Sequence, residues 1–394
     1  MAHQRLEHAI VIGGSIAGLL ATKVVSKIFN RVTLIDRGAT TKKNHPPPRE
    51  GEGESQLKSV TCSRYLLETV VRQQVAKLPN VQFLDACKVQ GLLTAENSSA
   101  IQGVCYQRLE DNKHATLSAQ LVVDTRGRGS YAAHWLRQLG VTPPPQTRVD
   151  GGLGYATRRY RIPASAKPDC KVMLISHEPP DQPRLGYLAQ VENDQWIATL
   201  GGYGKKYPPL DTEGFLAFAQ TLEHPHFNQA IRTAEPCSDI IAHRATANRL
   251  YYYEKVALPS GFVALGDAVC ALCPVYGQGM TVSALSSLVL QRWLTKIQTK
   301  GSKLDGNTFQ KQLARSNSSA WSLATSRDSG FAFTQGAIKQ QGFGNKVLLG
   351  YTKRLLKQTQ QDGEMHLLMM EVAHLLKSPM SLFHPQIVGK VLLS

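Results

Sequence analysis

Three small residues near the amino terminus have the spacing of a dinucleotide-binding turn. In VIGGSIAGL (residues 11–19), Gly13, Ser15 and Gly18 occupy the conserved positions of a Gly-x-Gly-x-x-Gly pattern, with serine replacing the middle glycine. Such a turn allows a tight bend, a close approach of the backbone to a pyrophosphate, and close packing of the next helix on the strand. The free N–H groups at the start of that helix also favour phosphate oxygens.

A carboxylate follows at the sequence spacing that is typical of a dinucleotide-binding unit. Asp36 lies 18 residues after Gly18 (36 − 18) and ends a second apolar run, where it can bind the hydroxyls of an adenosine ribose. The apolar run 8–12, a helix over 16–28 and a strand over 31–36 together predict a βαβ unit. A glycine turn that binds no ligand is the alternative interpretation.

A second glycine turn with an acid occurs far along the chain, in GFVALGDAVCALCPVYGQGM (residues 261–280). Gly266 and Asp267 end a predicted buried strand, and Pro274 and the glycines after it lead into a predicted helix over 279–297. The N-terminus of that helix suits an anionic group, such as the N1–C2 carbonyl region of a reduced flavin. A third segment, LVVDTRGRGS (residues 121–130), is by itself only a strand with a glycine turn.

The other elements must position these turns. Residues 38–59 hold three consecutive prolines and alternating Gly and Glu, which predicts an exposed loop. A second, mostly antiparallel sheet is predicted from the strand-like segments 151–162, 171–177, 185–192 and 195–202. Further predictions are helices over 62–78 and 211–233, strands over 81–84, 87–93, 100–109, 115–123 and 261–267, and a mainly helical end.

Together, the three motifs resemble the FAD-binding hydroxylase superfamily, the single-component flavoprotein monooxygenases that include p-hydroxybenzoate hydroxylase and squalene epoxidase. The segments WIATLGGYG, DTEGFLAFAQTL, AEPCSDIIAHR and ALGDAVCALCPVYGQGMTVSAL are most similar to the polyprenyl-methoxyphenol-hydroxylase-like group. The resemblance covers most of residues 6–300. It implies an α/β chain (α+β overall) with a Rossmann-type FAD-binding domain (1–150 and 245–300), an inserted, mostly antiparallel substrate-binding sheet (151–244) and a helical C-terminal region (301–394).

The resemblance also implies which residues bind FAD. The pyrophosphate would be held by the first glycine turn, the adenosine by the end of the second strand, and the isoalloxazine by the turn before the long helix. The implied set is Gly13, Gly14, Ser15, Ala17, Gly18, Asp36, Arg37, Arg64, Val89, Asp124, Gly127, Gly266, Asp267, Pro274, Gly277, Gln278, Gly279 and Met280.

The implied reaction is that of an FAD-dependent monooxygenase. NAD(P)H would visit as a transient co-substrate, and a flavin C4a-hydroperoxide would hydroxylate or epoxidise an aromatic, isoprenoid or polyketide-like small molecule, as in secondary metabolism. Relatives carry a longer segment where this chain has 38–59; Arg49 is the candidate remnant of its arginine and the one catalytic candidate. The alternatives are a flavin-dependent reductase or dehydrogenase of an isoprenoid and a non-catalytic FAD-binding protein.

Several features bear on other classes of protein. Cys270-x-x-Cys273 suggests either a redox dithiol or two packing residues, and no histidine spacing predicts a metal site. The net charge of +16 is concentrated towards the C-terminal third, but no nucleic-acid motif accompanies it. A cytoplasmic protein is expected; Leu and Met at helical spacing in 364–394 leave open a weak association with a membrane surface. The oligomeric state is not predicted.

Overall fold

The computed structural model describes residues 5–38, 49–51, 59–94, 99–178, 181–336, 350–351, 354–359 and 361–392. A five-stranded parallel sheet in the order β18-β9-β1-β2-β5 forms its centre. The strands are β1 (Leu6–Ile12), β2 (Phe29–Ile35), β5 (Val81–Leu84), β9 (Leu121–Asp124) and β18 (Phe262–Ala264). Most residues of β1, β2, β9 and β18 are buried, as expected for a parallel sheet covered on both faces.

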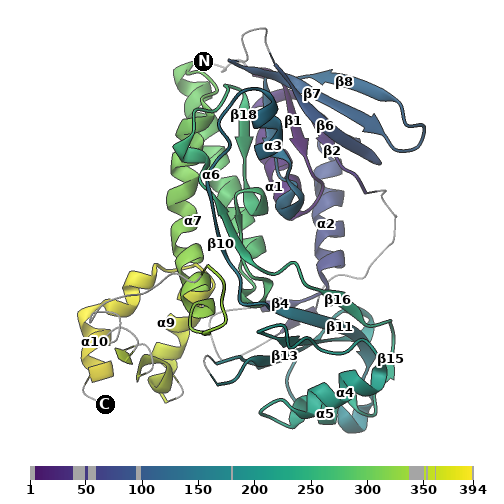
Figure 1. Cartoon of the computed structure of the whole chain (residues 1–394), viewed down its shortest axis with the longest axis vertical. Coiled ribbons are helices and arrows are strands. Elements are labelled where there is room, and N and C mark those ends of the chain that lie inside the picture. Colours follow the sequence, from purple (N-terminus) through teal and green to yellow (C-terminus); the bar gives the residue numbers. More distant parts are fainter. Residues whose placement is uncertain are drawn as a thin grey trace.

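Helices cover this sheet, and the chain also forms smaller, separate sheets. The helices are α1 (Ile16–Val25), α2 (Arg64–Ala76), α3 (Ala132–Gln138), α6 (Gly279–Lys300) and α7 (Gly306–Asp328). An antiparallel sheet, β6 (Cys87–Thr94), β7 (Ile101–Arg108) and β8 (His114–Ser118), lies at one end of the molecule (Figure 1). A short hairpin joins β3 (Arg49–Gly51) and β4 (Ser59–Thr61), and β10 (Gln146–Val149), β17 (Asn248–Tyr251) and β19 (Cys270–Ala271) form a small sheet.

The second large sheet is antiparallel throughout and lies at the other end of the molecule (Figure 1). Its strands are β11 (Gly154–Arg161), β12 (Val172–Ile175), β13 (Arg184–Gln190), β14 (Trp196–Gly202), β15 (Glu235–Pro236) and β16 (Ile241–His243). Helices α4 (Thr212–Gln220) and α5 (His226–Ile231) cover one of its faces, where side chains such as Trp196 and Phe215 form a buried cluster. The predicted fold class is therefore confirmed.

Two predicted elements are wrong in their limits. The strand expected over 115–123 ends earlier, as β8, because the chain turns at Ala119–Gln120; the strand expected at the start of LVVDTRGRGS is confirmed as β9, in the parallel sheet. The helix expected over 211–233 is broken into α4 and α5. The break falls just before Pro225, whose ring disfavours helical backbone at the preceding residue.

The helical region expected over 301–394 includes helices with two different sets of contacts. Helix α7 packs on α6, with Phe309 and Leu313 in the same buried cluster as the parallel sheet. The later elements α9 (Gly363–Ala373), a 3-10 helix (Pro379–Phe383) and α10 (Pro385–Leu392) form a small lobe with its own buried cluster (Figure 1). Thus α7 belongs to the central fold, whereas the described part of the last lobe has a buried cluster of its own.

Candidate flavin site

A pocket of about 620 Å³ opens along the carboxyl ends of the parallel strands. Its lining joins the turns after β1, β2, β9 and β18 to the start of α6, which is where open α/β sheets bind their ligands. Fourteen of the predicted site residues line it: Gly13, Gly14, Ser15, Ala17, Asp36, Arg37, Arg64, Val89, Gly127, Asp267, Pro274, Gly277, Gly279 and Met280. The tertiary structure therefore brings together turns that are up to 267 positions apart (280 − 13).

The first turn leaves no room for larger side chains. Gly13 has φ +106°, and a Cβ on Gly14 would lie 2.6 Å from Asp36 Oδ2. A Cβ on Gly18 would lie 1.7 Å from the carbonyl oxygen of Gly13, so α1 starts directly against the end of β1. Helix α1 has no acidic residue in its first turn, which leaves the positive end of its dipole available to an anion.

Serine at the middle position of the pattern fits the same backbone. Ser15 has φ −81° and ψ −177°, an extended conformation that needs no glycine. Its hydroxyl donates to Glu68 Oε1 (2.5 Å) and accepts from Arg64 Nη2 (3.0 Å), so the side chain connects the turn to α2. Glu68 is a residue that the sequence analysis missed.

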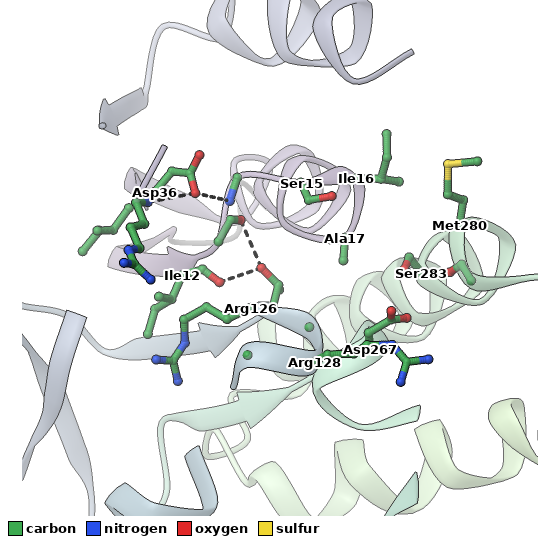
Figure 2. Close-up of a pocket in the computed structure, with 18 of the residues that line it drawn as sticks. Ile12, Ser15, Ile16, Ala17, Asp36, Arg126, Arg128, Asp267, Met280 and Ser283 are labelled. Carbon is green, nitrogen blue, oxygen red and sulfur yellow. Dashed lines mark hydrogen bonds between the residues drawn. The ribbon is translucent and has the colours of Figure 1, made fainter. Parts of the chain in front are cut away.

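Asp36 lies at one end of the pocket. Its Oδ1 accepts from the backbone N–H groups of Gly14 (3.2 Å) and Arg37 (2.9 Å), which ties the end of β2 to the glycine turn. Figure 2 shows Asp36 on the side of the pocket opposite Asp267, Ser283 and Met280. An elongated ligand can therefore place a ribose at Asp36 and a second ring system near α6.

The far end of the pocket combines a half-buried acid with arginines. Burial raises the pKa of Asp267, and the charges of Arg128, Arg64 and Arg249 act in the opposite direction. Arg128 is fixed by the carbonyl oxygens of Ala247 and Leu272, both at 2.6 Å. Helix α6 begins here, and Gly277 (φ +66°) makes the turn that precedes it.

Four predicted site residues do not line the pocket. Asp124 is fully buried and accepts from the backbone N–H and guanidinium of Arg126 and from Ser130 Oγ, so it shapes the turn after β9. Gly18 and Gly266 allow close packing: a Cβ on Gly266 (φ +64°) would lie 3.0 Å from the Ala17 Cβ. Gln278 is buried at the N-cap of α6 and donates to the carbonyl oxygen of Ala373 (3.0 Å).

The sequence analysis missed the pocket residues of the TRGRG turn. Thr125 Oγ1 donates to the carbonyl oxygen of Ile12 (2.7 Å), and the Arg126 guanidinium lies 3.9 Å from the centre of the Trp135 ring. Two arginines in a glycine turn directly after a buried strand were the available signal. The missed lining residues are Ile12, Ile16, Ile35, Cys87, Lys88, Thr125, Arg126, Arg128, Gly129, Tyr131, Leu272 and Ser283.

The two cysteines behind the pocket are free thiols in a buried environment. Burial raises the pKa of both Cys270 and Cys273 to about 12, so neither is a thiolate at neutral pH. This favours the interpretation of Cys270-x-x-Cys273 as packing residues over a redox dithiol.

Two other predictions concern the rest of the chain. Arg49 begins β3, but its side chain and most of residues 38–59 lie outside the described residues. Across the described ranges, no group of three or more His, Cys, Asp or Glu residues could hold a metal ion, and no helix is long and apolar enough to cross a membrane.

The fold is that of flavin-dependent halogenases and monooxygenases. The myxobacterial chondrochloren halogenase CndH superimposes with a TM-score of 0.62 at 13% identity, covering 88% of this chain and 89% of the halogenase. PqsL of Pseudomonas aeruginosa, a probable FAD-dependent monooxygenase, superimposes with a TM-score of 0.55 at 14% identity, covering 83% and 94%.

At the level of sequence, Protein Rv3254 of Mycobacterium tuberculosis is 28% identical over 352 residues, covering 73% of each chain. No family model matches the chain. The predicted resemblance is thus confirmed at the level of the fold.

The residues present fit FAD. A Cβ on Gly13 or Gly14 would crowd the turn, and the volume of the pocket falls in the range of about 300–1,000 Å³ typical of small-molecule sites. Five basic residues line the pocket (Arg37, Arg64, Lys88, Arg126 and Arg128) against Asp36 and Asp267, which suits a diphosphate. Gly13, Gly14 and Ser15 would hold the pyrophosphate, Asp36 the ribose, and Pro274 to Met280 the ring system.

Proposed function

We propose that this protein is an FAD-dependent monooxygenase that hydroxylates or epoxidises a neutral, lipophilic or aromatic small molecule, with NAD(P)H as reductant. The observation that carries the proposal is the continuous pocket whose lining extends from Asp36 to Met280 at the start of α6. When bound, FAD would supply the activation of oxygen. The chain's own tasks are to bind the cofactor, orient the substrate and exclude water.

The second sheet offers a surface for the substrate. Alternate residues of β11, β13 and β14 pack against α4 and α5, so the others point to the opposite face. One row across this face is set by the strand register: Ile241, Thr157, Thr199, Tyr187 and Leu174. Leu174 is 63% exposed and Ile241 67%, and the two threonine hydroxyls are hydrogen bonded to each other at 2.8 Å.

This row supports the proposed class of substrate. It contains apolar and hydroxyl side chains and no ionised group, so it favours a neutral molecule with a large apolar surface. Tyr155 lies on the same face. Its pKa is raised, by burial first and then by Cys273, and the charges of the pocket residues Arg128 and Arg64 partly oppose this rise.

The experiment that tests the proposal is spectroscopic and kinetic. Purified protein is mixed with FAD, then with NADPH or NADH in air, and oxygen uptake is recorded with a panel of phenols and isoprenoids. Stimulation by one compound, with a hydroxylated or epoxidised product, supports a monooxygenase. A saturated or desaturated product without oxygen incorporation indicates the alternative reductase or dehydrogenase.

Two further outcomes contradict the proposal. Slow oxidation of NAD(P)H whatever compound is added favours a non-catalytic FAD-binding protein. If FAD fails to bind at micromolar concentrations, the assignment of the pocket itself is wrong.

A further inference from the structure

The turn that closes the α6 end of the pocket has little regular structure to support it. It runs over residues 273–279 (the 273–279 turn), follows the two-residue strand β19, and contains only the 3-10 helix Pro274–Tyr276 before α6 begins. Pro274, Gly277 and Gly279 line the pocket. Side-chain contacts from elsewhere in the chain must therefore determine where this turn lies.

One of these contacts is a buried carboxylate at the end of α7. Asp328 is 1% exposed and accepts hydrogen bonds from three side chains: the Tyr276 hydroxyl, the Tyr203 hydroxyl (2.8 Å) and Asn248 Nδ2 (2.5 Å). Asn248 Oδ1 in turn accepts from the backbone N–H of Cys273 (2.7 Å). The carboxylate is thus connected to the first residue of the turn and to its central tyrosine.

The three donors also explain how an acid is tolerated at this position. Burial raises the pKa of Asp328, and the hydrogen bonds from Tyr276, Tyr203 and Asn248 lower it. A buried carboxylate without such donors would be strongly destabilising. The network therefore links the end of α7 to the second sheet, through Tyr203, and to the 273–279 turn.

The end of the turn is held by the C-terminal lobe. Gln278, at the N-cap of α6, donates from Nε2 to the carbonyl oxygen of Ala373, the last residue of α9 (3.0 Å). Leu375, two residues later, packs against the buried cluster that includes Cys270, Leu272 and Val282. Both contacts come from the region beyond residue 300, which the motifs of the nucleotide fold do not include.

We propose that Asp328 is a positioning residue for the flavin: through Tyr276 it fixes the 273–279 turn, with Ala373 fixing the other end, so that the C-terminal region completes the cofactor site. This inference rests on FAD binding at the pocket, as proposed above, and does not depend on monooxygenase activity.

A pair of tyrosines gives a matched test. Tyr276→Phe and Tyr203→Phe each remove one hydroxyl that donates to the same carboxylate, but only Tyr276 belongs to the turn. The full-length variants are compared by the dissociation constant for FAD, the visible spectrum of the bound flavin, and the melting temperature of the apoprotein. Tyr276→Phe is expected to weaken FAD binding at least about fivefold and to shift the flavin bands, since a hydrogen bond to a charged group is lost at the turn.

Both variants should lower the melting temperature of the apoprotein by similar amounts. Tyr203→Phe, however, should leave the FAD affinity within about twofold and the flavin spectrum unchanged. Equal effects of the two variants on FAD affinity, or no effect of Tyr276→Phe on affinity and spectrum, would overturn the inference and leave Asp328 with a purely structural role. If the wild-type protein binds FAD but oxidises no substrate, the proposed reaction fails and the positioning test still applies. If it does not bind FAD, both fail.

Discussion

At the scale of single residues, the pocket depends on charges whose environments differ. Asp36 accepts from two backbone N–H groups at one end of the pocket, whereas Asp267, at the other end, lies among arginine charges. Behind the pocket, His177 is 3% exposed and its ring centre lies 4.7 Å from that of Tyr203. These residues lead to two predictions.

Replacing Asp36 by asparagine should weaken FAD binding about tenfold. The amide oxygen can still accept from the Gly14 N–H, so the turn is retained, while the charged partner of the ribose hydroxyls is lost. Hydrogen bonds to charged groups contribute about 1.5–3 kcal/mol, and ~1.4 kcal/mol corresponds to tenfold. Titration of the apoprotein with FAD by flavin fluorescence measures this. Glu223→Gln, the same change at an exposed residue beyond α4, is the control, and an equal effect there would contradict the assignment.

His177 should make the protein less stable as the pH falls. Burial lowers its pKa to about 3, with the charge of Arg327 acting in the same direction, so protons bind the unfolded chain first. Stability from this group is complete above about pH 6.5 and decreases below it, by about 2 kcal/mol between pH 7 and pH 5. His177→Phe should remove that part of the pH dependence in urea unfolding. His226→Phe, at an exposed position, should retain the wild-type profile; parallel profiles for all three proteins would refute the explanation.

At the scale of elements, the site depends on how closely α1 approaches β1 and on which face of the second sheet is open. Gly18 sits where the first turn of α1 touches the end of β1. In the second sheet, the strand register places Leu174 and Tyr187 side by side on the face opposite α4 and α5. Each arrangement can be tested with one substitution and a matched control.

Gly18→Ala should destabilise the protein by about 3 kcal/mol and abolish FAD binding. The added Cβ would lie 1.7 Å from the Gly13 carbonyl oxygen, so backbone must move, as in a strongly overpacked core. Gly129→Ala is the control, because it also lines the pocket but its Cβ would meet no atom within 4 Å. Thermal unfolding with and without FAD gives the comparison. Equal melting temperatures for the two variants would show that the close approach is not needed.

Leu174→Glu should weaken the binding of a neutral aromatic compound at least about tenfold without changing FAD affinity. A buried leucine side chain contributes about 1.5–3 kcal/mol, and a charge on the face adds a desolvation cost. The measurement is the perturbation of the flavin spectrum by naphthol. Leu288→Glu makes the same change on α6, where Leu288 is 50% exposed. Equal loss in both variants, or none in Leu174→Glu, would exclude this face as the substrate surface.

At the scale of the whole molecule, the pocket is built from both halves of the nucleotide fold and closed by a turn that the C-terminal region holds. The lobe of α9 and α10 also exposes Leu376, Met380 and Leu392, and Lys390 on it is paired with Asp362 and Glu364. The association with a membrane surface and the cytoplasmic location are predictions. Binding to vesicles with and without anionic lipid would test the association with a membrane.

The sequence alone determined the local part of this protein. Glycine spacing and apolar runs predict the βαβ unit, Asp36 at the end of its second strand and the turn before α6, because these depend on backbone sterics and on neighbouring residues. The contacts between segments that lie far apart in the sequence were decided only by the tertiary structure. No sequence motif marks Asp328, which contacts the 273–279 turn only because α7 packs on α6. Gln278 donates a hydrogen bond to a carbonyl oxygen 95 residues away. Such contacts follow from how helices pack, which a single sequence pattern does not encode.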